Sequence, residues 1–330
     1  MLVEELMNVQ FNFNNEKSIQ SLAMDFLTVV QQAAIAAHPW VGRGNKIEAD
    51  RSGTEAMRNK LNTIDMLGTV VIGEGELDEA PMLYIGEKLG TGQGVEVDIA
   101  VDPVEGTSLM AKGQDHSIAV IAVAKKGCLL HAPDMYMKKL AVGPKAKGAI
   151  DLNKSLTENM KSVAKAMGKD VKDLTVIIQD RERHDDLVQE VFELGAKVKL
   201  FSDGDVNYAV ATALDELDGD IMVGIGGAPE GVIAAAALKC LGGDFQAQLV
   251  AQNVEEMTRC QKMGLEDLNK VLYLEDIVKT DDCFFAATGI TDGALLRGVK
   301  QKDNMMVTHS FLSTGGGLNH SQFVEVKHSI

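Results

Sequence analysis

The spacing of apolar and polar positions predicts two helices near the start of the chain. Residues 18–37 carry apolar side chains at the three-to-four-residue interval of one helix face. The His38–Pro39 step ends this helix, because the residue before a proline avoids helical backbone angles. Residues 45–64 read as a second helix. The chain is therefore expected to begin its folded part with two consecutive helices.

Strand-like patterns follow these helices. Residues 68–76 are a short β-branched run that enters a glycine turn, and residues 95–102 alternate before becoming wholly apolar. Residues 116–130 read as a strand, a turn at Lys125–Gly127 and another strand, which is a hairpin signal. The first half of the chain is thus predicted to pack helices on an antiparallel sheet.

The second half alternates strands and helices more regularly. Strands are predicted at 173–180, 196–205, 219–227, 283–291 and 304–312, and helices near 184–195, 205–215 and 229–240. Such alternation is typical of α/β units. A boundary near 145–160 divides the chain into an N-terminal α+β half, residues 1–150, and a C-terminal α/β half, residues 151–330. The predicted fold class is α/β.

Composition and charge exclude some partners. The chain has 330 residues and a formal net charge of −16, which opposes binding to nucleic acid and to anionic membranes. Its apolar runs are shorter than the roughly 18 residues that span a bilayer, and the N-terminus lacks the features of a secretory signal. The four cysteines form no CxxC pair and are expected to be buried thiols in a reducing compartment. We therefore expect a cytoplasmic protein without membrane or nucleic-acid partners.

Acidic residues gather where predicted strands end. In "DIAVDPVEGTSLM", residues 98–110, Asp102 and Glu105 stand three positions apart and precede a glycine and two hydroxyls. These carboxylates could instead begin a helix, with Asp102 as its cap. In "VVIGEGELDEAPM", Glu74 and Asp78 belong to a crowded acidic turn, which could equally be a solvated loop. Carboxylates this close repel one another unless a cation intervenes, and Mg²⁺ or Mn²⁺ prefers such ligands.

Three further segments follow strands and carry groups suited to phosphate chemistry. Residues 202–209 could be a turn with an Asp cap, and residues 224–238 join a glycine loop to Glu230 at a helix start. Residues 179–186 place two arginines after a strand, where they could bind phosphate or simply be solvated. No one segment is decisive, but together they predict metal-assisted phosphoryl chemistry.

Several motifs taken together resemble a known enzyme family. They are "VIGEGELDEAPMLYIGEKLG", "DIAVDPVEGT", "APDMYMKKLAVGP", "DGDV" and "GIGGAPEGV". They resemble class II (GlpX-type) fructose-1,6-bisphosphatase, within the superfamily of lithium-sensitive, metal-dependent sugar and inositol phosphatases, from about residue 20 to the end. The resemblance implies a layered α/β/α/β/α sandwich. It also implies metal-dependent hydrolysis of fructose 1,6-bisphosphate at C1, giving fructose 6-phosphate and phosphate in gluconeogenesis, with Mn²⁺ or Mg²⁺ as cofactor.

The resemblance also implies roles for individual residues. Asp50 and Glu74 would bind one metal ion, and Asp102, Glu105 and Glu230 a second. Thr107 would orient or deprotonate the attacking water, with Asp50 or Asp78 taking the proton. The residues expected to bind the substrate are Glu105, Gly106, Thr107, Tyr136, Arg181, Glu182, Arg183, Asp203, Gly204, Asp205 and Gly227. Most metal ligands thus fall in the N-terminal half and most substrate-binding loops in the C-terminal half.

Some alternatives stay open at this stage. Relatives that also accept sedoheptulose 1,7-bisphosphate, and inositol-phosphate phosphatases with the same DPVEGT element, are the competing enzymes, and a non-catalytic sugar-phosphate sensor is a third possibility. Asn45, Glu182 and Ser108 depart from the residues expected of the family. The family implies a homo-oligomer, a dimer or a tetramer, and the apolar N-terminal helix could serve an interface.

Overall fold

Two mixed β-sheets organise the molecule. The computed structural model describes residues 19–73, 82–265, 267–315 and 320–329, and the statements below refer to these residues. The first sheet contains β1 (Met66–Ile72), β2 (Lys88–Leu89), β3 (Val95–Glu105), β4 (Ile118–Lys125), β11 (Cys283–Gly289), β12 (Lys300–Lys302), β13 (Met305–Thr314) and β14 (Ser321–Ser329). Its order is β12-β13-β11-β4-β3-β1-β2, and β14 pairs with β13.

The second sheet lies against the other side of a central helical layer. It contains β5 (Tyr136–Val142), β6 (Thr175–Gln179), β7 (Lys197–Phe201), β8 (Ile221–Gly227), β9 (Asp244–Val250) and β10 (Leu272–Tyr273), in the order β10-β9-β5-β8-β6-β7. The helices are α1 (Ala23–Ala37), α2 (Lys46–Leu61), α3 (Thr107–Ala111), α4 (Leu156–Met167), α5 (Asp185–Glu193), α6 (Asp205–Ala211), α7 (Ala228–Leu241), α8 (Val254–Lys262) and α9 (Leu274–Ile277).

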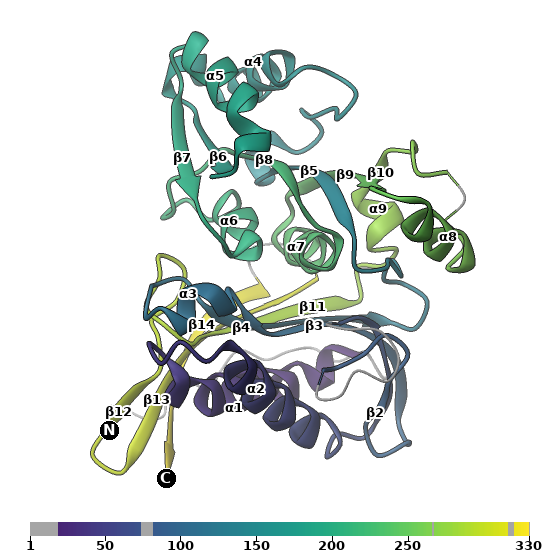
Figure 1. Ribbon diagram of the computed structural model, residues 1–330, viewed down its shortest axis with the longest axis vertical. Helices are drawn as coiled ribbons and strands as arrows, with labels where there is room; N and C mark the ends of the chain where they lie inside the picture. The colour runs from purple at the N-terminus through teal and green to yellow at the C-terminus, as the bar shows by residue number, and fades with distance from the viewer. Residues whose placement is uncertain (1–18, 74–81, 266, 316–319, 330) are drawn as a thin grey trace.

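These elements stack as five layers, as Figure 1 shows. Helices α1 and α2 cover the outer face of the first sheet, α6 and α7 lie between the two sheets, and α4 and α5 cover the second sheet. Three clusters of buried apolar residues fill the spaces between these layers. The predicted α/β/α/β/α sandwich is therefore confirmed.

Helix α7 forms the centre of the core. All of its fourteen residues except Pro229, Glu230 and Lys239 are buried, and a run of four alanines, 234–237, occupies its middle. A helix that is apolar on every side belongs in an interior, and small side chains let both sheets approach it closely. Pro229 stands in its first turn, where a proline costs no hydrogen bond. The helix therefore begins abruptly at the end of β8.

The two N-terminal helices confirm the sequence prediction. Helix α1 ends at Ala37, before Pro39, and α2 begins after Asn45, whose side chain accepts a hydrogen bond from the Glu48 amide. Asn45 departs from the family pattern but still caps the helix. The apolar face of α1 packs on the first sheet, so that face is not available for the subunit interface that was suggested for it.

Two local predictions are wrong. The first sheet is not wholly antiparallel, because β1 and β3 run parallel. The turn at Lys125–Gly127 does not lead into a paired strand, and Leu129 forms only an isolated bridge with Val278. The tight turn is present, but the chain after it crosses toward the second sheet.

Strand β3 positions the start of the candidate site. The helix-cap alternative for Asp102 is wrong, because the strand continues to Glu105 and α3 starts only at Thr107. The pairing with β4 shifts between Asp102 and Glu105. Gly106 then adopts a left-handed conformation, with φ of 78°, that a residue with a side chain rarely takes. This irregular strand end carries both carboxylates inward.

The sheets exchange segments along the chain. Strand β5, before the predicted boundary, belongs to the second sheet, whereas β11 to β14 return to the first sheet. The division into residues 1–150 and 151–330 remains a prediction about domains. Within the described part of the chain, no helix is both long enough and apolar enough to cross a bilayer.

We predict that the core beneath α1 depends strongly on Phe26. Its ring is fully buried and meets the Phe284 ring edge-on, with centroids 5.2 Å apart. The Phe26→Ala substitution should lower the free energy of unfolding by about 3–5 kcal/mol, because it leaves a cavity. Phe192→Ala, at an exposed position, should change it by less than about 0.5 kcal/mol. Equal effects in chemical denaturation would contradict this assignment of the core.

Candidate metal and phosphate site

Three of the predicted metal ligands converge between the two sheets. Asp102 and Glu105 come from the end of β3, and Glu230 comes from the first turn of α7. One carboxylate oxygen from each lies within 4.8 Å of the others. Asp102 and Glu105 are 7% and 4% exposed, so little water screens their charges. Residues more than a hundred positions apart in the chain thus form one acidic cluster.

Two glycines make room for this cluster. A Cβ atom at Gly227 would lie 1.9 Å from Glu230 Oε2, and one at Gly226 would lie 2.3 Å from Asp205 Oδ2. Any side chain at either position would displace a carboxylate. The glycine loop that the sequence analysis singled out therefore packs directly against acidic side chains.

Burial raises the pKa of two of the clustered carboxylates, Glu105 and Glu230. The pKa of Glu105 lies well above its ordinary value because the group is desolvated and Asp102 and Glu230 are close. Burial also raises the pKa of Glu230, although the charge of Lys139 opposes that effect. Both shifts have one physical cause: negative charges gather here away from water, where a cation would stabilise them.

A second pair of predicted residues adjoins the cluster. The Thr107 hydroxyl lies 2.9 Å from Asp50 Oδ1 and 2.8 Å from the Val104 carbonyl oxygen. Burial raises the pKa of Asp50 to about 6, against the opposing effects of Thr107 and Lys46. Asp50 belongs to α2 and Thr107 starts α3, so this contact joins a residue of the outer helical layer to the end of β3.

Lys139 also belongs to the site, although it is absent from the predicted metal ligands and substrate contacts. It is 1% exposed, and its Nζ lies 2.5 Å from Asp205 Oδ2 and 2.7 Å from the Gly227 carbonyl oxygen. It therefore links β5 to α6 and to the end of β8. The preceding Lys138 points to the other face of the strand, because side chains alternate. The sequence does carry a signal for Lys139. It lies two residues after Met137 and just before a run of apolar residues in β5, so it is expected on the buried face of the strand.

Tyr136 and Arg183 form another predicted group that the structure brings together. The Arg183 guanidinium lies over the Tyr136 ring, 5.2 Å from its centroid. Its Nε and Nη2 donate to the Ile225 carbonyl oxygen, at 3.0 and 2.7 Å. Tyr136 is paired with Gly227 in the sheet, so this group stands beside the glycine loop.

His184 has a structural role. Its Nδ1 donates to the Gln179 carbonyl oxygen at 2.8 Å, and its Nε2 accepts from the Ile225 amide at 2.8 Å. Burial lowers its pKa, which agrees with a neutral ring that donates on one side and accepts on the other. It holds the 3₁₀ turn of Glu182–His184 against β8, and thereby the backbone next to Arg183.

The remaining predicted residues are placed differently. Arg181, just before the 3₁₀ turn, and Glu182, at its start, are both exposed, and Arg181 donates to the neighbouring Asp180 carbonyl oxygen. Asp203 is partly buried, and its carboxylate accepts from the Gly204 amide. The Val206 amide, in α6, reaches Glu105 Oε1 at 3.3 Å. Glu74 and Asp78, predicted as a ligand and a proton acceptor, lie outside the described residues.

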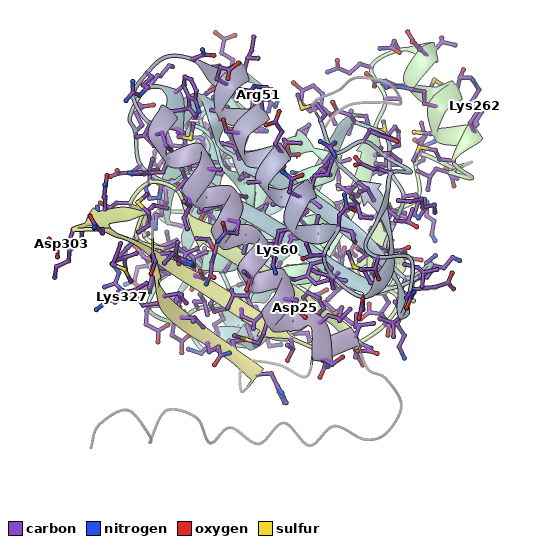
Figure 2. All side chains as sticks on the ribbon, turned by 90° about the horizontal axis from the view of Figure 1, so that it is seen from below. Asp25, Arg51, Lys60, Lys262, Asp303 and Lys327 are labelled. Carbon is purple, nitrogen blue, oxygen red and sulfur yellow. The ribbon has the colours of Figure 1, made fainter. Side chains whose placement is uncertain are left out.

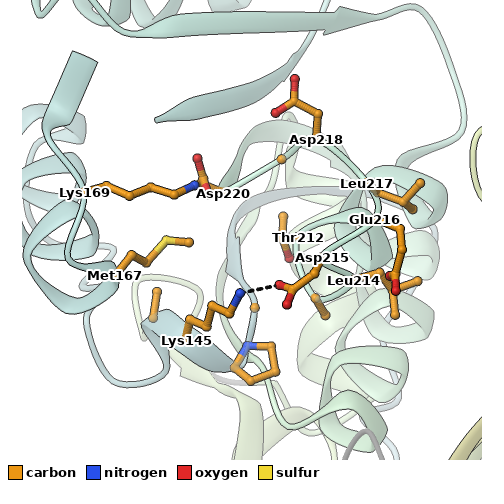
Figure 3. A pocket seen from close by; sticks show the side chains of 15 residues that line it. Lys145, Met167, Lys169, Thr212, Leu214, Asp215, Glu216, Leu217, Asp218 and Asp220 are labelled. Carbon is orange, nitrogen blue, oxygen red and sulfur yellow. Dashed lines mark hydrogen bonds and ion pairs between the residues drawn. The ribbon is translucent and has the colours of Figure 1, made fainter. Parts of the chain in front are cut away.

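A cavity of about 470 Å³ lies at the other end of β5 and β8 (Figure 3). Lys145 and Lys169 line it, and each is paired with an acid, Asp215 and Asp220 respectively, at 2.6 Å. Its two lysines are therefore already neutralised within the wall. The cavity is separate from the acidic cluster and does not resemble a phosphate site.

The acidic cluster fits a divalent cation. Mg²⁺ and Mn²⁺ bind oxygen ligands, and the three carboxylates supply them from rigid elements. Glu230 Oε2 is buried and has no hydrogen-bond partner among the described residues. A buried carboxylate oxygen without a partner is costly, and coordination to a cation would satisfy it.

The layered fold (Figure 1) and this carboxylate cluster are the features that the sequence analysis expected of a metal-dependent phosphatase. Comparison with known families then identifies the protein more closely. Residues 20–328 match the family described as bacterial fructose-1,6-bisphosphatase, glpX-encoded, and the chain belongs to this family. The family enzymes are phosphoric monoester hydrolases.

Curated relatives agree over nearly the whole chain. The chain is 48% identical over 309 residues to fructose-1,6-bisphosphatase 1 class 2 of Escherichia coli K12, covering 90% of this chain and 92% of that one. It is 47% identical, with the same coverage, to the class 2 enzyme of Haemophilus influenzae. It is also 47% identical to a D-fructose 1,6-bisphosphatase class 2/sedoheptulose 1,7-bisphosphatase of Synechococcus sp. JA-3-3Ab, covering 84% and 87% of the two chains.

We predict that Lys139 is required to keep Asp205 in place. Lys139→Met should lower the free energy of unfolding by about 3–5 kcal/mol, because removing one partner leaves an uncompensated buried charge. Lys138→Met is the matched control and should have little effect. The double variant Lys139→Met/Asp205→Asn should recover part of the loss, measured by chemical denaturation. If Lys139→Met is no more destabilising than Lys138→Met, the buried pair does not have this role.

Proposed function

We propose that this protein hydrolyses the C1 phosphate of fructose 1,6-bisphosphate and releases fructose 6-phosphate and phosphate. The observation that carries the proposal is the convergence of Asp102, Glu105 and Glu230 beside the Thr107–Asp50 pair. Family membership supports the same reaction. In this proposal the reaction takes place in the cytoplasm and serves gluconeogenesis. The protein acts as a homo-oligomer.

The cation would be Mn²⁺ or Mg²⁺. Asp102, Glu105 and Glu230 would hold this cation. A second ion would bind Asp50, and Glu74, its other predicted ligand, lies outside the described residues. When bound, such ions neutralise phosphate charge and lower the pKa of a coordinated water. The three carboxylates are carried by β3 and α7, which are mostly buried.

Thr107 and Asp50 would position and deprotonate the attacking water. Asp50 is an acceptor at 2.9 Å from the Thr107 hydroxyl, and the Val104 carbonyl oxygen offers that hydroxyl a second acceptor. The single Thr107 proton can therefore point to either side, which leaves the hydroxyl oxygen able to accept from water. The backbone at Gly106–Thr107 would steady the negative charge that develops on the phosphate.

Arg183 and Tyr136 would bind the distal C6 phosphate. The guanidinium is fixed by the Ile225 carbonyl oxygen and by the ring beneath it, so its position needs little ordering when substrate binds. A fixed cation at a distance from the acidic cluster selects substrates that carry two phosphates. Arg181 and Asp203 to Asp205 complete the proposed substrate contacts.

A second substrate is supported by the named relatives. Cyanobacterial proteins at 45–47% identity are named dual fructose 1,6-/sedoheptulose 1,7-bisphosphatases. Both sugars carry a phosphate at C1 and another at the far end of the molecule, and Ser108 departs from the residue expected of the family. Activity on both bisphosphates is therefore our alternative proposal.

One activity matrix tests the proposal directly. The purified protein is assayed for phosphate release with Mn²⁺, Mg²⁺ or a chelator. The substrates are fructose 1,6-bisphosphate, sedoheptulose 1,7-bisphosphate and inositol 1-phosphate. Release from fructose 1,6-bisphosphate that chelation abolishes and metal restores is the expected result. Preferred release from inositol 1-phosphate, or none from any substrate, would reject the proposed function.

We predict that Thr107→Ala lowers kcat by about 100-fold or more, because the water loses its positioning hydroxyl. The affinity for the activating metal should change little, since the carboxylate cluster is intact. Thr258→Ala is the control, because that hydroxyl is exposed on α8 and donates to the Val254 carbonyl oxygen. Steady-state kinetics and metal titration make the comparison, and near-normal turnover in Thr107→Ala would exclude Thr107 from the chemistry.

We predict that Arg183→Met raises KM for fructose 1,6-bisphosphate about tenfold or more and changes kcat less. The loss should be much smaller with fructose 1-phosphate, which has no distal phosphate to bind. Arg297→Met, which removes an exposed arginine beside β14, serves as the control. An equal loss with both substrates would show that Arg183 does not read the second phosphate.

A further inference from the structure

Strand β14 is the outermost strand at one edge of the first sheet, as far as the described residues show. It is nine residues long, Ser321–Ser329, and among the described strands it pairs only with β13. Its side chains alternate between partly buried and exposed over its central part. A long, regular edge strand offers its unpaired backbone groups to another strand, and natural proteins usually cover or block such an edge.

The side chains of β14 are sorted between two faces. Val324, Val326 and His328 are partly buried, and Val324 packs against the core beneath α1. Phe323, Glu325 and Lys327 are exposed on the opposite face, where Phe323 is 51% exposed. Figure 2 shows Lys327 at the margin of the molecule. One face of this edge strand is therefore largely apolar, and the other face carries a negative charge, Glu325, and a positive charge, Lys327.

We propose that β14 pairs antiparallel with β14 of a second copy of this chain, about a two-fold axis at Val326. This register sets Glu325 opposite Lys327 of the partner subunit, and does so twice because the interface is symmetric. If the axis moved from Val326 to Glu325, Glu325 would lie opposite Glu325 of the second copy, and the two negative charges would repel. A shift in the other direction sets Lys327 opposite its own copy, so charge selects the central register.

The surrounding residues support the same register. Glu325 already contacts Arg297 of its own chain at 2.7 Å, so a lysine from the second copy would extend an existing ion pair into a network. Val326 lies on the axis and faces its own copy, a β-branched pair that suits adjacent strands. The result would be one continuous sheet through two subunits, with the phosphatase sites on the far side of each first sheet from α1.

Cysteine cross-linking tests the register. Val326→Cys places two thiols directly opposite each other, with Cα atoms about 4.5–5.5 Å apart, a distance that a disulfide can span. Val324→Cys lies on the same face but about two residue pairs from the axis, so its two copies are too far apart. With mild oxidation, Val326→Cys should form a covalent dimer rapidly, whereas Val324→Cys and the unmodified protein should not.

Charge reversal tests the same contact without cysteines. Glu325→Lys and Lys327→Glu should each weaken dimerisation about tenfold or more, because like charges then oppose each other across the axis. An equimolar mixture of the two variants should regain the dimer mass, since every facing pair becomes complementary. Size-exclusion chromatography with light scattering gives the masses over a concentration series.

Several results would overturn the proposal. They are a monomeric wild-type protein at every concentration, equal cross-linking of the two cysteine variants, or single charge variants that dimerise as well as wild type. The proposed reaction does not depend on this contact, so loss of the dimer with retained phosphate release would leave the proposed function intact.

Discussion

Lys139 brings a positive charge into a buried region where carboxylates otherwise gather. It holds Asp205 at 2.5 Å and the Gly227 carbonyl oxygen at 2.7 Å, and so ties together the three elements that meet around Glu230. One lysine cannot neutralise Asp102, Glu105, Asp205 and Glu230. The excess negative charge is stable only if protons or cations enter. This imbalance of charge, held in a fixed place, is what suits the region to a divalent cation rather than to a structural ion pair.

The negative charges accumulate because the ends of strands from both sheets bring carboxylates to the same buried region. Asp102 and Glu105 arrive on β3 of the first sheet, whereas Glu230 follows β8 of the second. The alanine-rich helix α7 keeps the two sheets close enough for these ends to meet. Gly226 and Gly227 then let the backbone pass within contact distance of carboxylate oxygens. The site is therefore a property of the layered stacking, and neither sheet has it alone.

Local patterns of apolar residues predicted the helices and strands that are buried on one face or on all sides. Helices α1 and α2 were predicted within a few residues of their ends, because apolar spacing and Pro39 define them locally. The strand expected after Gly127 was wrong, because a turn signal does not specify where the following chain will pair. Strands β9 and β14 were not predicted, although Val324 and Val326 alternate with charged residues along β14. Parallel pairing of β1 with β3 depends on distant segments and left no local signal.

The chemistry of the site divides in the same way. The sequence by itself determined which residue types stand at strand ends, the glycine loop before Glu230, and the family to which the motifs belong, because these are short-range features. The family resemblance implied that Asp102, Glu105 and Glu230 bind one ion. Only the tertiary structure decided that this place is buried, that Lys139 enters it, and that Arg183 rests on Tyr136. The reason is physical: convergence and desolvation depend on packing between sheets that are far apart along the chain, whereas a motif records only neighbours.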